Sequence, residues 1–317
     1  MTGISFFFIV GVGRSGTTLL MCMLNEHPDI VTPPEFHFIS QHMVKRPNMG
    51  MFEASERLKK DPRFVRLGLD VEDVIRPFKD EKEPFSPDRL YRSILSTYAD
   101  KYKACVIGDK APKNIEYLPV LHKVFPECRI IHLIRDPRDV YLSRIKAAWS
   151  MSRPDTLQFL AYRAQYGMGH QIGLRLFGDN YLEVHYEELL KQPETELKCI
   201  CDFLEVPFSH KMMNFSNSAR RLVFSDEINW KKEALGPLLI NNKDKWRSEL
   251  PSEKVARIEA ACSPVFKKGF YTPSQQGRTL QSVIRYRIID GYMAILSELY
   301  HLLTMAKNRR ILRFMDS

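Results

Sequence analysis

An apolar segment, a glycine-rich turn and an amphipathic segment follow one another at the start of the chain. Residues 4–10 read ISFFFIV, residues 11–18 read GVGRSGTT, and residues 17–26 place apolar side chains at helical spacing. Glycines at such a junction let the backbone curl until successive N–H groups converge on an anion at the start of the helix. This order predicts an α/β sheet with a phosphate-binding turn at the carboxyl end of its first strand.

Three further apolar runs predict the rest of the sheet. They cover residues 104–107, 129–134 and 181–185. The runs are continuous rather than alternating, as in parallel strands that helices cover on both faces. Helical patterns follow at 137–149 and 187–204. The alternation predicts a P-loop-like, doubly wound parallel sheet flanked by helices.

Two parts of the chain lie outside this alternation. Residues 40–100 are rich in proline and charge, and they predict a mostly helical insertion over the carboxyl edge of the sheet, where open α/β folds bind ligands. Residues 211–250 are rich in Asn, Ser and Lys and predict loops. The tail from Gln281 has apolar residues near helical spacing. We therefore expect a main domain over 1–275 and a basic, amphipathic helical extension over 276–317.

The charge balance favours anionic partners. The 317 residues include 47 lysines and arginines against 38 aspartates and glutamates, a formal net charge of +9. Such a surplus attracts nucleotides, sulfated or phosphorylated molecules and acidic membrane surfaces. The basic residues are dispersed and form no nucleic-acid motif, so we expect no nucleic-acid partner. With 44% hydrophobic and 27% charged residues, the composition is that of a globular protein and excludes a disordered or collagen-like chain.

The six cysteines predict neither a disulfide framework nor a metal site. Most of them lie in apolar runs, where reduced and buried thiols are the rule. Cys199 and Cys201 are separated by one residue and have no second pair elsewhere, so zinc is not expected. The first apolar run is too short for a signal sequence or a membrane span, and no basic region precedes it. These features predict a cytoplasmic protein.

The glycine turn departs from the nucleotide-kinase pattern at one position. A Walker A loop reads Gly-x-x-x-x-Gly-Lys-Ser/Thr, and its lysine binds the β- and γ-phosphates. Gly11 and Gly16 fit this spacing, but Thr17 occupies the place of the lysine, and the cation stands three residues earlier at Arg14. This arrangement favours a shorter 5′-phosphate group with the reacting centre beside Arg14.

The sequence from residue 14 to residue 20, RSGTTLL, is followed by His27-Pro28. It resembles the 5′-phosphosulfate loop of the sulfotransferases that use 3′-phosphoadenosine 5′-phosphosulfate (PAPS). Its arginine form is similar to that of the protein-tyrosine sulfotransferases and their bacterial relatives. The resemblance implies that the loop holds the 5′-phosphate and that its arginine stabilises charge on the transferred group. The loop residues concerned are Arg14, Ser15, Gly16, Thr17 and Thr18.

A second phosphate site is indicated after the third apolar run. That run is followed by RDPR at 135–138, and Ser143 lies eight residues after Arg135. An arginine fork at the carboxyl end of a strand and a hydroxyl on the next helix can hold a phosphate together. The alternative is that Arg135 simply pairs with Asp136 or Asp139. By resemblance to the family, Arg135 and Ser143 bind the 3′-phosphate.

The other matches to nucleotide-binding residues are weaker. Tyr186, in the sequence VHYEEL, resembles the family's tyrosine that contacts the nucleotide, with a core tyrosine at a strand end as the alternative. Lys245, in the sequence KDKW, resembles the lysine that reaches a PAPS phosphate. The tyrosyl enzymes carry another arginine four residues after the serine. Here that position is Ala147, for which Arg144 or Lys146 is the expected compensation.

Two spacings indicate the residues that act on the transferred group. A hydroxyl or amine acceptor must lose its proton as it attacks sulfur, so a general base is required. Glu35 lies 21 residues after Arg14, the spacing of the family's glutamate base, and His37 is the second candidate. Lys110 lies 25 residues before Arg135, the spacing of the lysine that stabilises the transferring group in the tyrosyl sulfotransferases.

The resemblance therefore implies a PAPS-dependent sulfotransferase that transfers a sulfuryl group to a hydroxyl or amine acceptor and needs no metal. Its nucleotide product is 3′-phosphoadenosine 5′-phosphate (PAP), and the expected acceptor is a carbohydrate, a lipid or a small molecule. Two alternatives stay open. One is a P-loop kinase or NTPase, for which Asp109 and Asp136 are the candidate metal ligands. The other is a non-catalytic protein that binds polyanions.

The tail allows several interpretations. From Arg278 to Ser317 it has seven basic and three acidic residues. The helix expected there can pack onto the domain, or onto a second subunit in a homodimer. It can also make peripheral contact with an anionic membrane, at its inner face, because basic amphipathic helices lie on such surfaces.

Overall fold

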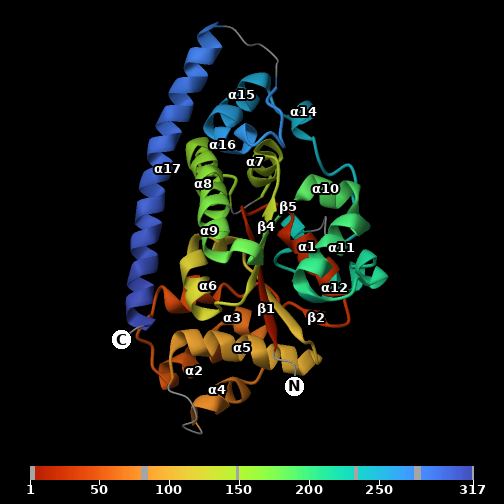
Figure 1. Cartoon of the computed structure of the whole chain (residues 1–317), viewed down its shortest axis with the longest axis vertical. Helices are drawn as coiled ribbons and strands as arrows, with labels where there is room; N and C mark the ends of the chain where they lie inside the picture. The colour runs from red at the N-terminus through yellow and green to blue at the C-terminus, as the bar shows by residue number, and fades with distance from the viewer. Residues whose placement is uncertain (1–3, 80–84, 148–149, 232–234, 275–279, 316–317) are drawn as a thin grey trace.

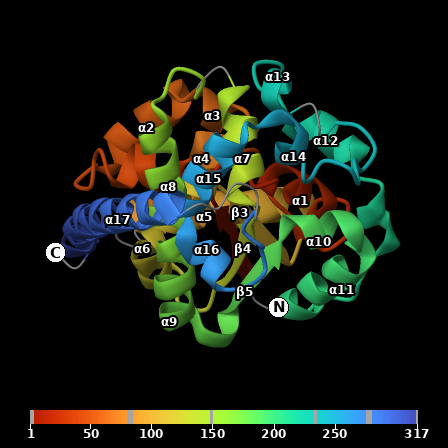
Figure 2. The same ribbon diagram turned by 90° about the horizontal axis from the view of Figure 1, so that it is seen from above.

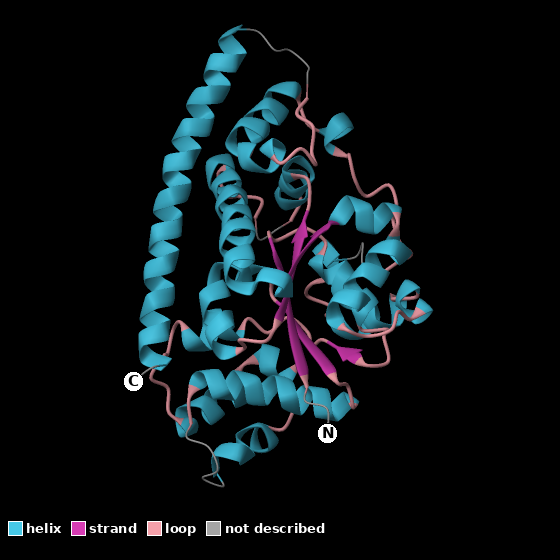
Figure 3. Cartoon of the chain, viewed as in Figure 1, coloured by secondary structure: helices cyan, strands magenta, loops and turns pink. Residues whose placement is uncertain are grey.

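The computed structural model describes residues 4–79, 85–147, 150–231, 235–274 and 280–315. Its centre is a sheet of five parallel strands in the order β2-β3-β1-β4-β5 (Figure 3). The strands are β1 (Ser5–Gly11), β2 (Ile30–Val31), β3 (Val106–Lys110), β4 (Arg129–Ile134) and β5 (Tyr181–His185). The strand order reverses between β1 and β4, so the crevice at which such sheets bind ligands lies at the carboxyl ends of these two strands.

The sheet confirms the doubly wound α/β fold. The runs 129–134 and 181–185 coincide with β4 and β5, and β1 and β3 are shifted by a few residues from the predicted runs. β2 was not predicted, because two residues are too few to show a period. It pairs with β3 through Ile30 and Val31. This pairing carries the following segment, residues 32–37, to the carboxyl edge of the sheet.

Helices cover both faces of the sheet, as continuous apolar strands require. In β1, Phe7 and Ile9 belong to the core on one face, and Phe8 and Val10 belong to the core on the other. Figures 1 and 2 show α1, α10, α11 and α12 on the first side of the sheet and α6, α8, α9 and α17 on the second. The α-helices are α1 (Thr17–Leu24), α2 (Met51–Lys60), α3 (Pro62–Val65), α4 (Val71–Lys79), α5 (Pro87–Tyr102), α6 (Leu118–Val124), α7 (Pro137–Ile145), α8 (Asp155–Gly167), α9 (Leu174–Phe177), α10 (Tyr186–Lys191), α11 (Pro193–Leu204), α12 (Ser216–Leu222), α13 (Ile228–Lys231), α14 (Trp246–Glu249), α15 (Ser252–Ala261), α16 (Ser263–Lys267) and α17 (Leu280–Met315).

The insertion over residues 40–100 is helical as predicted, but its position differs from the prediction. Tyr91 of α5 packs on Phe8 of β1 with ring centroids 6.2 Å apart, and apolar residues of α2, α4 and α5 share one core with Phe8 and Ile107. Figure 1 shows α2, α4 and α5 at the end of the molecule where β1 begins. The predicted cap over the carboxyl edge is therefore wrong, because these helices bury their apolar sides against a face of the sheet.

Several helix boundaries also differ from the predicted ones. The run 187–204 forms two helices, α10 and α11, which are separated at Gln192 because Pro193 begins a new helix. The helix predicted over 137–149 ends at Ile145, and residues 148–149 lie outside the described ranges. Within the predicted loops, α12, α13 and α14 form short helices. The boundary between the domains at 275 also lies outside the described residues and stays a prediction.

The C-terminal helix α17 runs along one side of the molecule (Figure 1). The face of α17 that points toward the domain forms hydrogen bonds with it at several positions along the helix. Asn308 Nδ2 donates to the carbonyl oxygen of Glu116 at 2.8 Å, and Arg163 donates to Asp290 at 2.7 Å. Met293 is buried between them. One face of the tail thus packs onto the domain, as one interpretation predicts. Within the described ranges, no helix combines the length and the apolar character needed to span a membrane.

Candidate functional site

The turn after β1 has the backbone of an anion-binding loop. Gly11, Arg14 and Gly16 have φ angles of 152°, 81° and 93°, which glycine adopts most readily. A Cβ atom at Gly16 would lie 2.3 Å from the ring of Tyr186, so a glycine is required there. α1 begins at Thr17, and the first N–H groups of a helix have no acceptor within it. These amides are donors that an anion can accept from.

Two side chains of the turn complete this loop. Arg14 Nε donates to Ser143 Oγ at 3.0 Å, which joins the turn after β1 to α7, the helix after β4. The hydroxyl of Ser15 is buried and has no hydrogen-bond partner among the described residues. Burying a hydroxyl without a partner costs free energy. A phosphate oxygen of a bound ligand would supply the missing partner.

Arg135 follows the carboxyl end of β4 and reaches across to the turn. Its guanidinium donates to the carbonyl oxygen of Arg14 at 3.2 Å and to that of Asn242 at 2.9 Å. It also lies 4.4 Å from the ring centre of Tyr186. Its Nε is buried and has no partner among the residues that the structure describes. Arg135 therefore presents a buried donor to a ligand while it holds the loop backbone.

The two carboxylates beside Arg135 have other partners. Asp136 caps α7 and accepts from Arg138, and Asp139 accepts from backbone N–H groups of the turn 244–246. Within the described part of the chain, Arg135 forms no ion pair with either of them. The alternative in which this arginine serves only as an ion-pair partner is therefore wrong.

Tyr186 and the turn before α14 complete the surroundings of Arg135. Tyr186 is the first residue of α10 and is buried. Its hydroxyl accepts from Asn242 Nδ2 at 2.8 Å, so the ring is held between Gly16 and Arg135. Lys245 precedes α14 in the turn that Asp139 holds. The structure thus brings both of the weaker predicted residues to the same side of the sheet as the loop.

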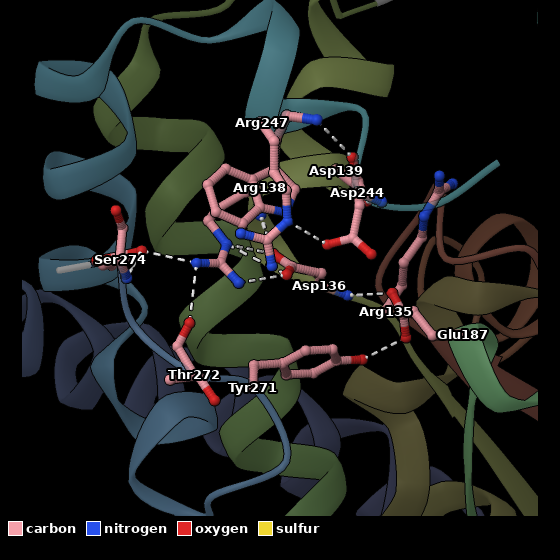
Figure 4. Close-up of polar contacts among 12 residues, drawn as sticks. Arg135, Asp136, Arg138, Asp139, Glu187, Asp244, Arg247, Tyr271, Thr272 and Ser274 are labelled. Carbon is pink, nitrogen blue, oxygen red and sulfur yellow. Dashed lines mark hydrogen bonds and ion pairs between the residues drawn. The ribbon is translucent and has the colours of Figure 1, made fainter. Parts of the chain in front are cut away.

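Arg138 lies beside Asp136 and links it to neighbouring helices (Figure 4). It is buried, and its Nε lies 2.9 Å from Asp136 Oδ1 and its NH1 group 2.7 Å from Glu259 Oε1. Its guanidinium lies 3.7 Å from the ring centre of Trp246. Glu187 accepts the N–H of Asp136 at 3.0 Å. The second arginine of RDPR therefore ties α7 to α14 and α15, a structural role that the sequence did not reveal.

A second group of charged side chains lies at the carboxyl ends of β2 and β3. Glu35 follows β2, and Lys110 is the last residue of β3, the neighbouring strand. Lys110 Nζ forms an ion pair with Glu35 Oε2, and its side chain is fully buried. His37 Nε2 lies 2.9 Å from Glu35 Oε1. The predicted base, the predicted lysine and the second candidate base thus contact one another.

Lys231 joins this group and was not predicted from the sequence. Its Nζ lies 3.5 Å from Glu35 Oε2 and 2.5 Å from Glu227 Oε1, and only 8% of its side chain is exposed. The sequence signal is the spacing of four between Glu227 and Lys231, which occurs on the surfaces of many helices. That spacing gives no hint of the contact with Glu35, which is distant in sequence.

The charges around Glu35 set its protonation state. Burial acts to raise the pKa of Glu35, but Lys110, the hydrogen bond with His37 and Lys231 outweigh burial and hold the pKa well below its usual value. Burial and the nearby Lys110 in turn lower the pKa of Lys231. Glu35 is therefore a carboxylate at neutral pH, flanked by two lysines, and it is able to accept a proton.

Of the carboxylates that a kinase would use for a metal ion, Asp136 and one oxygen of Asp109 are bonded within the fold, whereas Asp109 Oδ1 is buried without a partner among the described residues. Asp109 Oδ2 accepts from Tyr91 at 2.6 Å and from Asn114 at 3.1 Å, and Asp136 is the cap of α7. Burial raises the pKa of Asp109, which disfavours the charged form that a cation requires. Among the described residues, no three His, Cys, Asp or Glu side chains are grouped so that they could hold a metal ion.

The two cations expected to compensate for Ala147 both have partners among the described residues. Arg144 is buried, and its guanidinium donates to the carbonyl oxygens of Gly13 at 3.3 Å and Gln158 at 3.1 Å. Lys146 forms an ion pair with Glu249, and more than half of its side chain is exposed. Arg144 thus stabilises the backbone of the glycine turn through its hydrogen bond to Gly13.

Known proteins resemble the chain along much of its length. Residues 7–210 match the model of a family described as the sulfotransferase family. The chain is 24% identical over 274 residues to protein-tyrosine sulfotransferase A of Caenorhabditis elegans, an alignment that covers 85% of this chain and 68% of that protein. The sulfotransferase domain of the Synechococcus PCC 7002 olefin synthase superposes with a TM-score of 0.64 and 24% identity, covering 86% of this chain and 96% of that one. The sulfotransferase domain from the curacin biosynthetic pathway gives a TM-score of 0.57 and 21% identity, covering 83% and 98%.

Proposed function

The chain belongs to the sulfotransferase family, and from that premise we propose that it transfers a sulfuryl group from PAPS to a hydroxyl or amine acceptor, with Glu35 as the general base. The observation that carries the proposal is the ion pair between the carboxylate of Glu35 and the buried Lys110, one strand away from the glycine turn after β1. This pair places a proton acceptor and a fixed cation at one edge of the sheet.

The residues present fit the phosphates of PAPS. The loop amides from Gly16 to Thr18 suit the 5′-phosphate, together with the Ser15 hydroxyl, which has no partner among the described residues; the Ser15 amide itself donates to the carbonyl oxygen of Val12. The buried Nε of Arg135 and the hydroxyl of Ser143 suit the 3′-phosphate. Tyr186 packs against Arg135, and Lys245 lies in the neighbouring turn before α14. When bound, PAPS supplies the activated sulfuryl group.

The side chains around Glu35 carry out the proton and charge steps. The acceptor oxygen attacks sulfur while Glu35 takes its proton, the bond from sulfur to the 5′-phosphate breaks, and PAP leaves. Because neighbouring cations make Glu35 a weak base, the proton moves late, once bond formation has acidified the acceptor. Lys110 and Arg14 stabilise the negative charge on the sulfuryl oxygens and the leaving phosphate, which are roles that metal ions fill in kinases.

Calorimetric titration with PAP, beside adenosine 5′-phosphate and magnesium ATP, tests this function. We expect micromolar binding of PAP without magnesium, and much weaker binding of adenosine 5′-phosphate, which lacks the 3′-phosphate. A screen of carbohydrates, lipids and small molecules for release of PAP from PAPS then identifies the acceptor class. Tight binding of magnesium ATP without binding of PAP would favour a kinase. Salt-sensitive binding of heparin without binding of PAP would favour a polyanion-binding protein.

Lys231 offers a test of the base through the pH dependence of the reaction. Replacing it by methionine removes a cation 3.5 Å from Glu35, so the pKa of Glu35 rises. Since the base must be deprotonated, kcat falls as the pH drops through that pKa. We expect the acid limb of the kcat profile to move to higher pH by up to about one unit. Lys254→Met, which removes a partly buried lysine paired with Asp155 instead, should leave the limb in place. An unmoved limb in Lys231→Met would contradict the role of Glu35.

A further inference from the structure

The outer face of α17 is apolar and faces away from the domain. Its inner side is fixed by buried residues such as Met293 and Ile311, and Figure 1 shows the helix at the outer edge of the molecule. Figure 2, which looks along α17, shows that no other described element covers its far side. Large apolar residues recur there at steps of three or four, and each exposes more than half of its surface. They are Ile284, Ile288, Tyr292, Ile295, Leu299 and Leu302.

Arginines border this apolar stripe at both ends. Arg285, which forms an ion pair with Glu253 of α15, and Arg287 are exposed at its start, and Arg309, Arg310 and Arg313 are exposed at its end. These last three line a shallow groove with Phe314. Of the acidic residues that the structure describes on α17, Asp290 turns inward to Arg163 and Glu298 is exposed. The outer face therefore combines a continuous apolar stripe with a strong excess of positive charge.

This charge pattern does not suit a second copy of the same helix packed in parallel. A parallel pair would place Arg309, Arg310 and Arg313 beside their own copies. That arrangement brings like charges together at the rim of the apolar contact, where pairing helices normally carry opposite charges.

We propose that the outer face of α17 binds an anionic lipid surface. An amphipathic helix with a basic border lies in the plane of a membrane with its apolar face at the boundary between headgroups and acyl chains. The arginines can extend along such a helix to the phosphate groups, because long basic side chains keep their charged ends at the interface. α17 would hold the whole folded domain against the surface in one orientation, since its inner face is bonded to the domain along its length.

Sedimentation with lipid vesicles tests the proposal on the full chain. We expect the protein to sediment with vesicles of phosphatidylcholine and phosphatidylglycerol, and to stay in solution with phosphatidylcholine alone. Each arginine near such a surface contributes about fivefold in binding, so Arg309→Ala/Arg310→Ala/Arg313→Ala should lower partitioning on the order of 100-fold. The matched control, Lys191→Ala/Lys198→Ala/Lys211→Ala, removes three exposed charges from other elements and should lower it far less.

The apolar stripe has a separate test. Ile295→Ser/Leu302→Ser should also abolish sedimentation, whereas Phe52→Ser/Val65→Ser, at exposed apolar positions on α2 and α3, should not. An unchanged affinity for PAP shows that each variant is folded. Equal sedimentation with neutral vesicles, or no response to the arginine variant, would overturn the proposal. A dimer in light scattering that Ile295→Ser/Leu302→Ser dissociates, without any vesicle binding, would overturn it in favour of a second copy.

Discussion

Replacing Glu35 by glutamine is expected to lower kcat on the order of 1,000-fold, within the range that a positioned general base contributes. Glutamine keeps the size of the side chain and one oxygen that can accept from Lys110, but it cannot take a proton from the acceptor. The bonds around Arg135 do not involve Glu35, so the affinity for PAP should stay within a fewfold. The measurements are PAP release with the acceptor from the screen and calorimetric titration with PAP.

Glu227 provides a matched control for this variant. It contacts Lys231, which also contacts Glu35, and 18% of its side chain is exposed. Glu227→Gln changes the same chemical group in the same cluster, and we expect less than a tenfold loss of kcat. Equal losses in both variants would show that the charge of the cluster matters rather than the base. Full activity of Glu35→Gln would exclude Glu35 as the base and make His37 the candidate.

Replacing Arg135 by alanine is expected to weaken PAP binding on the order of 1,000-fold. The loss of two charge-assisted hydrogen bonds to a phosphate costs about 4 kcal/mol, which corresponds to this factor. The variant also removes the bonds from the guanidinium to the carbonyl oxygens of Arg14 and Asn242. Arg135→Lys keeps the charge without the fork, so its affinity should lie between those of alanine and the native arginine.

Arg129 is the first residue of β4, the strand that Arg135 follows, and it provides a control for the Arg135 variants. It forms an ion pair with the exposed Glu205, away from the loop. Arg129→Ala should leave the affinity for PAP unchanged and shift the melting temperature only slightly, because ion pairs with exposed partners contribute little. If Arg135→Ala bound PAP as tightly as the native protein while remaining folded, the phosphate role of Arg135 would be refuted.

The parts of the site that could be predicted from the sequence follow strands. Gly11 and Arg135 each lie directly after an apolar run, and parallel strands bring their carboxyl ends to one edge whatever the distance between them in sequence. Glu35 and Lys110 were placed by their spacing to these residues and by resemblance to the family. The structure shows that the two contact each other, but their roles in the reaction stay a prediction.

Other residues could not be predicted because their positions depend on packing. Lys231 lies in a segment of short helices without an apolar period, and only the tertiary fold brings it to Glu35. The same holds for Arg138, whose partner Glu259 lies on α15. The insertion between residues 40 and 100 was placed at the wrong side of the sheet, since an amphipathic pattern shows that a helix buries a face but does not show which surface receives it.

The contact between Gly16 and Tyr186 ties the choice of two residues together. Any side chain at position 16 would collide with the tyrosine ring, and a smaller residue at 186 would remove both the ring beneath Arg135 and the hydroxyl that meets Asn242. We therefore expect that a substitution at position 16 or at position 186 is tolerated only together with a change at the other position. Relatives that replace the glycine must also rebuild the support of the arginine, so these two positions should change together in lineages that modify their donor site.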